Sequence, residues 1–201
     1  MKSPAATGRW MQEGRASMGK TYEKLDDKLI RFIEAQKLFF VATAPLGADG
    51  HINLSPKGYD AFKVIDDMTV AYLDLGGSGI ETQAHVQENG RITIMFCAFE
   101  GPANILRLYG QGEAIDVGNP RYPEMLALFP GFDRARAVIV IKIHRIADSC
   151  GWGVPFYEFK GERDQLTRYI GNKAVDDWTE SCFQKNAESI DGLPGIVRPK
   201  S

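Results

Sequence analysis

The chain has 201 residues, of which 44% are hydrophobic and 25% are charged, and its net charge is −2. This length and composition describe one ordinary globular domain that can bury a full core. The charge gives no support to binding of nucleic acid or of an anionic membrane surface, which both require a basic face, and no apolar run is long enough to span a bilayer.

Residues 1–19 contain several glycines and a proline but lack the apolar core of a signal peptide. We predict that they form a flexible N-terminal extension and that residues 20–201 form the domain, with a C-terminal helix and arm. The three cysteines, Cys97, Cys150 and Cys182, show no CxxC spacing. This pattern is typical of a reduced, cytoplasmic protein and does not indicate a zinc site.

The first elements in chain order are a helix and a hairpin. Apolar residues recur at helical spacing over 26–36, and Asp26 or Asp27 is available as the N-cap. Residues 38–44 are β-branched and aromatic, and after a glycine-rich turn the chain returns over 51–57. This pattern predicts two antiparallel strands.

A second hairpin and a short helix follow. Residues 62–65 and 68–75 flank an Asp-Asp turn and are predicted to pair. The sequence S-x-x-E from Ser78 to Glu81 matches a capping box, which predicts that Ser78 caps a helix. Gly90 is expected to end that helix in the left-handed conformation.

The later strands are predicted at 91–99, 105–115 and 138–147. Gly110 and Gly112 indicate a bent or bulged strand, as barrels use at their corners.

Two further helices are expected, at 120–129 and 161–178, before a Gly/Pro-rich tail. We therefore expect a mainly β (α+β) fold, a small six-stranded antiparallel barrel with flanking helices. The hairpins between neighbours disfavour a parallel α/β sheet.

Lys57, the loop 76–79 and the helix that follows are the parts from which proteins build a phosphate site. Free amides at a helix start, together with the helix dipole, attract an anion, and the lysine adds charge. The alternative is that the helix is simply well capped, and Glu81 in its first turn would repel a phosphate unless it bonds back to Ser78.

Arg107 and Trp152 are further candidates. Alternation places Arg107 on the face opposite to Leu106 and Leu108. If that face is internal, the guanidinium needs an anionic or carbonyl partner; if it is external, Arg107 is solvated. Trp152, flanked by glycines, could be a platform for a flat ring or a core plug at a turn. The histidines show no metal-ligand spacing, and no hydrolase or nucleotide-hydrolysing motif is present.

Four stretches together resemble the pyridoxamine 5′-phosphate oxidase-like flavoproteins, over roughly residues 26–150. The resemblance implies a split β-barrel homodimer that binds FMN at the subunit interface and acts on a small molecule. The stretches are FFVATAP at 39–45, NLSPKGYD at 53–60, AH at 84–85 with ENGRI at 88–92, and ILRLYG at 105–110.

The resemblance also implies which residues contact the cofactor. Lys57 falls where these oxidases place a lysine near cofactor and substrate, and Arg107 falls beside the flavin ring. The cofactor-binding set that we expect is Asn53, Ser55, Lys57, Tyr72, Leu73, Ser78, Gly79, Thr82, Gln83, Arg107 and Trp152; no metal ligand is expected. The chain departs from the family where Ile52 replaces a phosphate-binding arginine, and it has no Arg-x-His near its C-terminus.

Two functions are compatible with these residues. The first is an FMN-dependent oxidoreductase that transfers hydride between a small substrate or NAD(P)H and the flavin. The second is a non-catalytic protein that binds or senses a flavin, or haem or F420, in the same barrel. Rapid reduction of bound flavin by NADPH or NADH would favour the enzyme.

Overall fold

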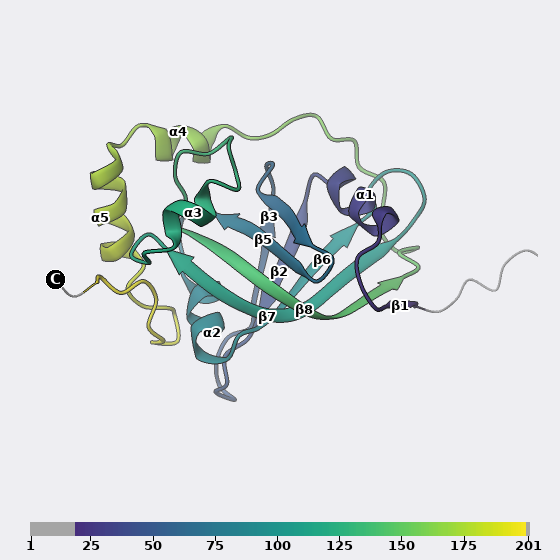
Figure 1. Cartoon of the computed structure of the whole chain (residues 1–201), viewed down its shortest axis with the longest axis horizontal. Coiled ribbons are helices and arrows are strands. Elements are labelled where there is room, and N and C mark those ends of the chain that lie inside the picture. The colour runs from purple at the N-terminus through teal and green to yellow at the C-terminus, as the bar shows by residue number, and fades with distance from the viewer. Residues whose placement is uncertain (1–18, 200–201) are drawn as a thin grey trace, which may run out of the picture.

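The computed structural model describes residues 19–199, in which helices flank one antiparallel sheet (Figure 1). The extension expected at 1–19 therefore lies outside the described residues, apart from Gly19. The elements are β1 Thr21–Tyr22, α1 Asp27–Ala35, β2 Phe39–Thr43, β3 Asn53–Lys57, β4 Phe62–Asp66, β5 Thr69–Asp74, α2 Glu81–Asn89, β6 Arg91–Cys97, β7 Ile105–Asp116, α3 Tyr122–Leu126, β8 Ala137–Ser149, α4 Gln165–Gly171 and α5 Val175–Lys185.

Seven strands pair in the order β3-β2-β6-β7-β8-β5-β4, and β1 pairs with the end of β8. The sheet curls but leaves β3 and β4 as its two edges, so it is a split barrel (Figure 1). The expected fold class is confirmed, but the expected count of six strands is wrong. The strand segments visible in the sequence already number seven, and the two-residue β1 is too short to leave a pattern.

The inner face of the curled sheet holds the larger core. Its strands contribute alternate residues, as in β2, where Phe39, Val41 and Thr43 are buried and the residues between them are not. Phe39 meets Phe62 and Tyr72 edge-on, with ring centroids 5.1 and 5.6 Å apart. Such aromatic pairs favour this geometry and add to the free energy gained by burial.

A second core lies on the outer face of β5 and β8, under the helices α3, α4 and α5 (Figure 1). Leu73 and Val138 point into it, and Trp178 and Cys182 of α5 cover them. Because β5 and the first part of β8, residues 137–141, are covered on both faces, their residues are mostly apolar rather than alternating.

The bend expected in the long strand β7 is confirmed. The register between β7 and β8 shifts between Tyr109 and Gly110. A Cβ at Gly110 would lie 2.4 Å from Ile141 Cγ2 and 2.6 Å from the backbone oxygen of Lys142. The strands therefore approach too closely for a side chain here, and the bulge turns β7 around the core.

The helix-end signals in the sequence hold for α1 and the end of α2. The amide of Leu29 donates to Asp26 Oδ1 over 2.8 Å, and Gly90 ends α2 with a φ of 72°. The helix expected over 161–178 is instead two, α4 and α5, because Gly171 and Asn172 are poor helix formers and interrupt it.

The segment after α5 packs against its own chain as far as the description extends. The amides of Gly195 and Ile196 donate to the carbonyls of Ala187 and Asn186, both over 2.8 Å. Ile196 is buried in the outer core, so this part of the expected C-terminal arm lies on the domain.

Within residues 19–199, no helix is long and apolar enough to cross a membrane. In the same part of the chain, no three His, Cys, Asp or Glu side chains gather closely enough to hold a metal ion.

Candidate functional site

The edge strand β3 turns its polar residues toward the barrel interior. Asn53, Ser55 and Lys57 pair with Thr43, Val41 and Phe39 of β2, whose side chains are buried, whereas the residues between them face outward. The position of Lys57 at the end of a strand is as the sequence predicted. We call Asn53, Ser55, Lys57, Asp74 and Thr82 the polar seam, because they join β3 to β5 and α2.

One half of the polar seam is a hydrogen-bond network. Asn53 Nδ2 donates to Thr82 Oγ1 over 2.9 Å and to Thr43 Oγ1 over 3.2 Å, and the Ser55 hydroxyl donates to Asn53 Oδ1 over 2.9 Å. Thr43 Oγ1 also lies 3.0 Å from His85 Nδ1. These contacts fix the first turn of α2 against the edge strand.

The other half of the seam is a buried group of charges. Asp74, which ends β5, accepts from Arg136 Nη2 over 2.8 Å and lies 3.6 Å from Lys57 Nζ. Arg136 Nη1 also donates to the carbonyl of Gly79 over 2.5 Å, and the amide of Gly76 lies 3.4 Å from Asp74 Oδ1. Lys57 and the glycine loop are therefore brought together through Asp74 and Arg136.

The ionisation of Asp74 follows from these contacts. Burial alone would raise the pKa of its carboxyl, but the ion pairs with Arg136 and Lys57 outweigh burial and hold that pKa at about 2. Asp74 is consequently a permanent anion at neutral pH. Arg136 is almost fully buried, whereas the Lys57 side chain remains 23% exposed.

The helix α2 begins later than the sequence indicated. Its N-cap is Ile80 without a side-chain hydrogen bond, so the prediction that Ser78 caps it is wrong. Gly76, Gly77 and Gly79 all have positive φ and extend the loop, and Ile80 is buried in the outer core. Burial of that side chain fixes where the helix starts, which leaves Ser78 and Gly79 exposed in the loop.

Glu81 does not reach back to Ser78. Its carboxylate accepts from the amide of Ile190 over 3.3 Å, in the segment after α5. The first amide of α2 with a backbone acceptor is that of Ala84, which donates to the carbonyl of Ile80. The amides before it lack helical partners, as at every helix start, which suits an anion. The Glu81 carboxylate lies beside Gly79, so it would have to turn away from a phosphate bound at this loop.

Several buried polar atoms near the seam lack partners among residues 19–199. They are Tyr72 Oη, both side-chain amide atoms of Gln83, His85 Nε2 and Arg136 Nε. Burial and the Asp74 charge raise the pKa of Tyr72 well above its usual value, and burial lowers that of His85. Both are neutral at pH 7, so Tyr72 retains an unused hydroxyl donor. Unmet polar groups of this kind fit a polar ligand such as a flavin phosphate or ring.

Three of the expected cofactor residues lie away from the seam. Leu73 points into the outer core beneath α5. Arg107 lies on the face of β7 opposite to Leu106 and Leu108, as predicted, and that face is the external one. Its guanidinium donates to Ser149 Oγ over 3.1 Å. Trp152 is 76% exposed and follows the end of β8. Asp74 pairs with Ala137, the first residue of β8. The length of that strand, about 40 Å of extended chain, therefore separates Trp152 from the seam.

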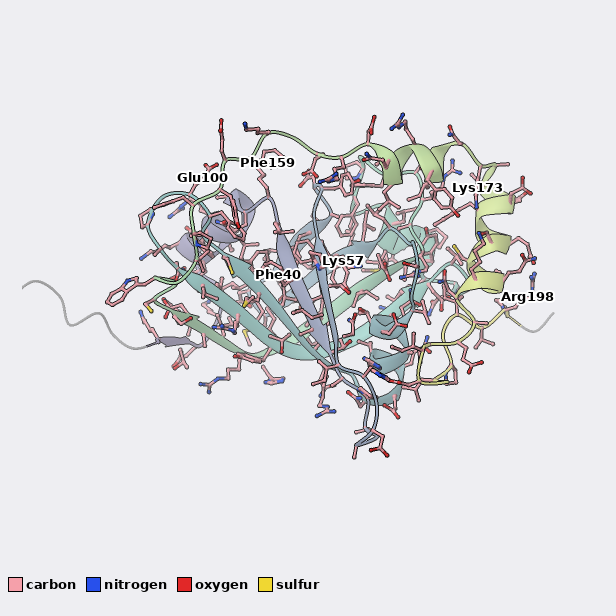
Figure 2. The ribbon with its side chains drawn as sticks, turned by 180° about the vertical axis from the view of Figure 1, so that it is seen from behind. Phe40, Lys57, Glu100, Phe159, Lys173 and Arg198 are labelled. Carbon is pink, nitrogen blue, oxygen red and sulfur yellow. The ribbon has the colours of Figure 1, made fainter. Side chains whose placement is uncertain are left out.

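The outward face of β3 and β2 is largely apolar, whereas β6 and β7 also present Arg91 and Arg107 on it. Ile52 and Leu54 are 78% and 64% exposed, and Phe40 and Met95 lie beside them on the same face. Figure 2 shows Phe40 and Lys57 on these strands with no helix in front of them. A hollow of about 360 Å³ opens on this face between Ile52, Arg91 and Tyr109, among other residues.

Sequence reasoning missed Asp74, Arg136, Thr43 and His85. The signal available for Asp74 was an acidic residue that ends an otherwise apolar strand, since such a residue needs a buried partner. Arg136 directly precedes the apolar strand β8 and carried the complementary signal. Their separation of 62 residues hid the pairing.

Comparison with known proteins gives consistent matches. A family model described as "Pyridoxamine 5'-phosphate oxidase" matches residues 25–150. A relative from Aspergillus flavus, "Pyridoxamine 5'-phosphate oxidase family protein ustO", is 37% identical over 194 residues, which cover 87% of this chain and 77% of the relative.

Solved structures with the same backbone arrangement include a variant of HupZ from group A Streptococcus. It is 27% identical with a TM-score of 0.51, over 61% of this chain and 98% of that one. An FMN-binding protein from Syntrophomonas wolfei is 16% identical with a TM-score of 0.42, over 57% of this chain and 79% of that one.

The charge group at Asp74 predicts a specific pH dependence. Because its folded-state pKa of about 2 lies below the usual 3.8, Asp74 contributes about 2 kcal/mol to the free energy of unfolding above pH 4, which is lost as pH falls toward 2. Asp74→Asn should be less stable by about 3 kcal/mol at pH 7, because Arg136 stays buried without its anion. The check is urea unfolding of both proteins between pH 2 and 7.

The control is Asp49→Asn, which changes an exposed carboxylate in the turn between β2 and β3. It should leave the unfolding free energy unchanged at pH 7 and keep the steep loss at low pH. If Asp74→Asn loses stability with falling pH as steeply as the unaltered protein does, the proposed role of Asp74 is wrong.

Proposed function

The chain belongs to the pyridoxamine 5′-phosphate oxidase family and has its FMN-binding split-barrel fold, and we propose that it is an FMN-dependent oxidoreductase acting on a small molecule or NAD(P)H. The observation that carries this proposal is the polar seam, where Lys57, Thr82 and the glycine loop meet. Bound FMN would supply hydride-transfer chemistry at its ring.

We assign the phosphate of FMN to Lys57, Thr82 and the amides around Gly79. A phosphate carries about −1.5 to −2 charges at pH 7 and needs several donors. Lys57 is suited to this role because its ammonium is partly exposed and its ion pair with Asp74, the only one it makes within residues 19–199, is long at 3.6 Å. Arg136 keeps Asp74 neutralised when Lys57 turns to a phosphate. Ser78, exposed in the same loop, can add a hydroxyl donor.

The same assignment gives the remaining seam residues their roles. Asn53 and Ser55 hold the first turn of α2 in place, so that the amides before Ala84 stay directed at one point. The unpartnered Tyr72 hydroxyl and Gln83 amide are the groups that can orient polar atoms of the ligand.

We further propose that the protein is a homodimer with the cofactor at the interface. The outward face of β3 and β2 exposes Leu54 beside the half-buried Phe40, and an exposed apolar patch is typical of an interface. Arg107 and Trp152 cannot join the seam of their own chain, since one lies on the opposite face and the other follows the far end of β8. A partner subunit packed on that face would place both beside a shared cofactor.

Phosphate recognition by Lys57 can be measured separately from ring recognition. We expect Lys57→Gln to raise the Kd for FMN by about tenfold to a hundredfold, because a charge-assisted hydrogen bond contributes about 1.5–3 kcal/mol. The Kd for riboflavin, which lacks the phosphate, should change less than twofold. Quenching of flavin fluorescence gives both constants.

The matched control for that measurement is Lys63→Gln, an exposed lysine on β4 with no ion-pair partner among residues 19–199. It should leave both constants unchanged. Equal losses of FMN and riboflavin affinity in Lys57→Gln would contradict the phosphate assignment, and a protein that quenches neither flavin would remove the proposed cofactor.

Turnover distinguishes an enzyme from a non-catalytic binder. We expect NADPH or NADH to reduce the bound FMN under anaerobic conditions within seconds, as turnover numbers of 1 per second or more are common for enzymes. Stopped-flow absorbance of the flavin records the rate. Inertness toward both donors would favour the binding or sensing alternative, and tighter binding of haem or F420 in a parallel titration would favour that cofactor.

The dimer depends on the outward sheet face in our proposal. We expect Leu54→Glu to convert the dimer to a monomer without lowering its thermal midpoint, because that side chain is already exposed in the single chain. Val175→Glu, at the start of α5 and outside that face, should remain a dimer. Sedimentation velocity measures the state of each, and an unaltered protein that sediments as a monomer refutes the proposal.

A further inference from the structure

A second cavity lies at the mouth of the half-barrel, away from the polar seam. Its volume is about 640 Å³, which is within the range of small-molecule sites, and none of the five seam residues lines it. Its walls come from α1, β4, the segment 128–132 and the segment 162–167. We call it the mouth cavity.

The floor of the mouth cavity is aromatic. Phe39, Phe62 and Phe96 line it, and the Phe62 and Phe96 rings meet at 87° with centroids 5.0 Å apart. Phe62 is only partly buried, so the cluster continues the barrel core up to the opening. Such a floor accepts an apolar body, and its ring faces attract a cation.

The rim of the mouth cavity is acidic. Glu34, Asp60 and Glu162 line it with one lysine, Lys63, and all four side chains belong to exposed residues. Among residues 19–199, none of the four lies within 4.0 Å of an opposite charge. The rim therefore has an uncompensated charge of about −2, which attracts cations.

The backbone at the rim is strained. Tyr59, which lines the cavity, is the only non-glycine residue of the described chain with positive φ, at 63°. Strain of this kind is typical of functional sites, where the surrounding structure maintains it. The Tyr59 hydroxyl donates to the carbonyl of Arg163 over 2.7 Å and so holds the segment that carries Glu162 over the opening. A Cβ at Gly58 would lie 3.4 Å from Glu162 Oε2, which places that carboxylate beside the strand end.

We propose that the mouth cavity binds an amphipathic organic cation, with its apolar body on the phenylalanine floor and its ammonium group among Glu34, Asp60 and Glu162. An anion of the same size would meet three carboxylates, and a purely apolar molecule would leave the charged rim unused. The site does not depend on the proposed function, because its residues are distinct from the seam.

Tryptamine and indole-3-propionate test the proposal, since they carry the same ring with opposite charges. We expect the full-length protein to bind tryptamine with a Kd at least tenfold lower than that for indole-3-propionate, measured by isothermal titration calorimetry. Addition of FMN should leave the tryptamine Kd unchanged. Failure of this binding is thus distinguishable from failure of flavin binding.

Charge-neutralising variants locate the ammonium group. Glu34→Gln, Asp60→Asn and Glu162→Gln should each raise the tryptamine Kd about two- to fivefold, the effect expected for one exposed charge pair, and Lys63→Gln should lower it similarly. Asp49→Asn, which changes a carboxylate outside the cavity, should have no effect. Thermal midpoints within a degree or two of the unaltered protein would show that each variant is folded.

Three outcomes would overturn the proposal. The first is absence of tryptamine binding at millimolar concentration. The second is equal affinity for the two indoles, and the third is an unchanged tryptamine Kd in a variant that combines the three carboxylate substitutions. Saturation-transfer NMR supplies an independent readout of ring contact in each case.

Discussion

The position of the candidate site depends on one buried carboxylate. Asp74 is 1% exposed, and without partners it would be too costly to bury in its charged form. Arg136 satisfies it and at the same time binds the carbonyl of Gly79, so the glycine loop is fixed to the end of β5. Lys57 adds a third charge from the opposite edge of the barrel. The same group that stabilises the fold therefore decides where the loop, the lysine and the start of α2 meet.

A split barrel has to join two edges that no hydrogen-bond ladder connects. Here β3 lies at one edge, and its inward residues use side chains in place of backbone pairing. Asn53 bonds to Thr43 and Thr82, and Lys57 reaches Asp74. Side-chain contacts of this kind can be exchanged for contacts to a ligand, whereas a backbone ladder cannot. An open barrel therefore offers a polar site at its seam that a closed barrel of the same size would lack.

The sequence predicted the features that depend on neighbouring residues, such as strand ends, the alternation of side chains and the bulge in β7. The β-type segment before Lys57 predicted that residue at a strand end, alternation predicted Arg107 opposite Leu106, and Gly110 indicated the bulge in β7, all of which the structure bears out. The capping box failed because burial of Ile80 outweighs one side-chain hydrogen bond at Ser78. Asp74 and Arg136 were missed since their pairing is tertiary and leaves no periodic trace. The sequence also could not show whether Arg107 faces the inside or the outside of the barrel. Alternation defines two faces of a strand but does not show which one the sheet encloses.

The stretch from Lys57 to Asp60 separates two regions of opposite charge. Lys57 faces the seam beside Arg136, while Asp60 lies on the acidic rim of the mouth cavity. Between them Gly58 and the strained Tyr59 lead the chain from β3 toward β4, and the hydrogen bond from Tyr59 to the carbonyl of Arg163 supports that conformation. This short connection thus places the seam, to which we assign a phosphate, and the mouth cavity, to which we assign a cation, on two sides of one strand end.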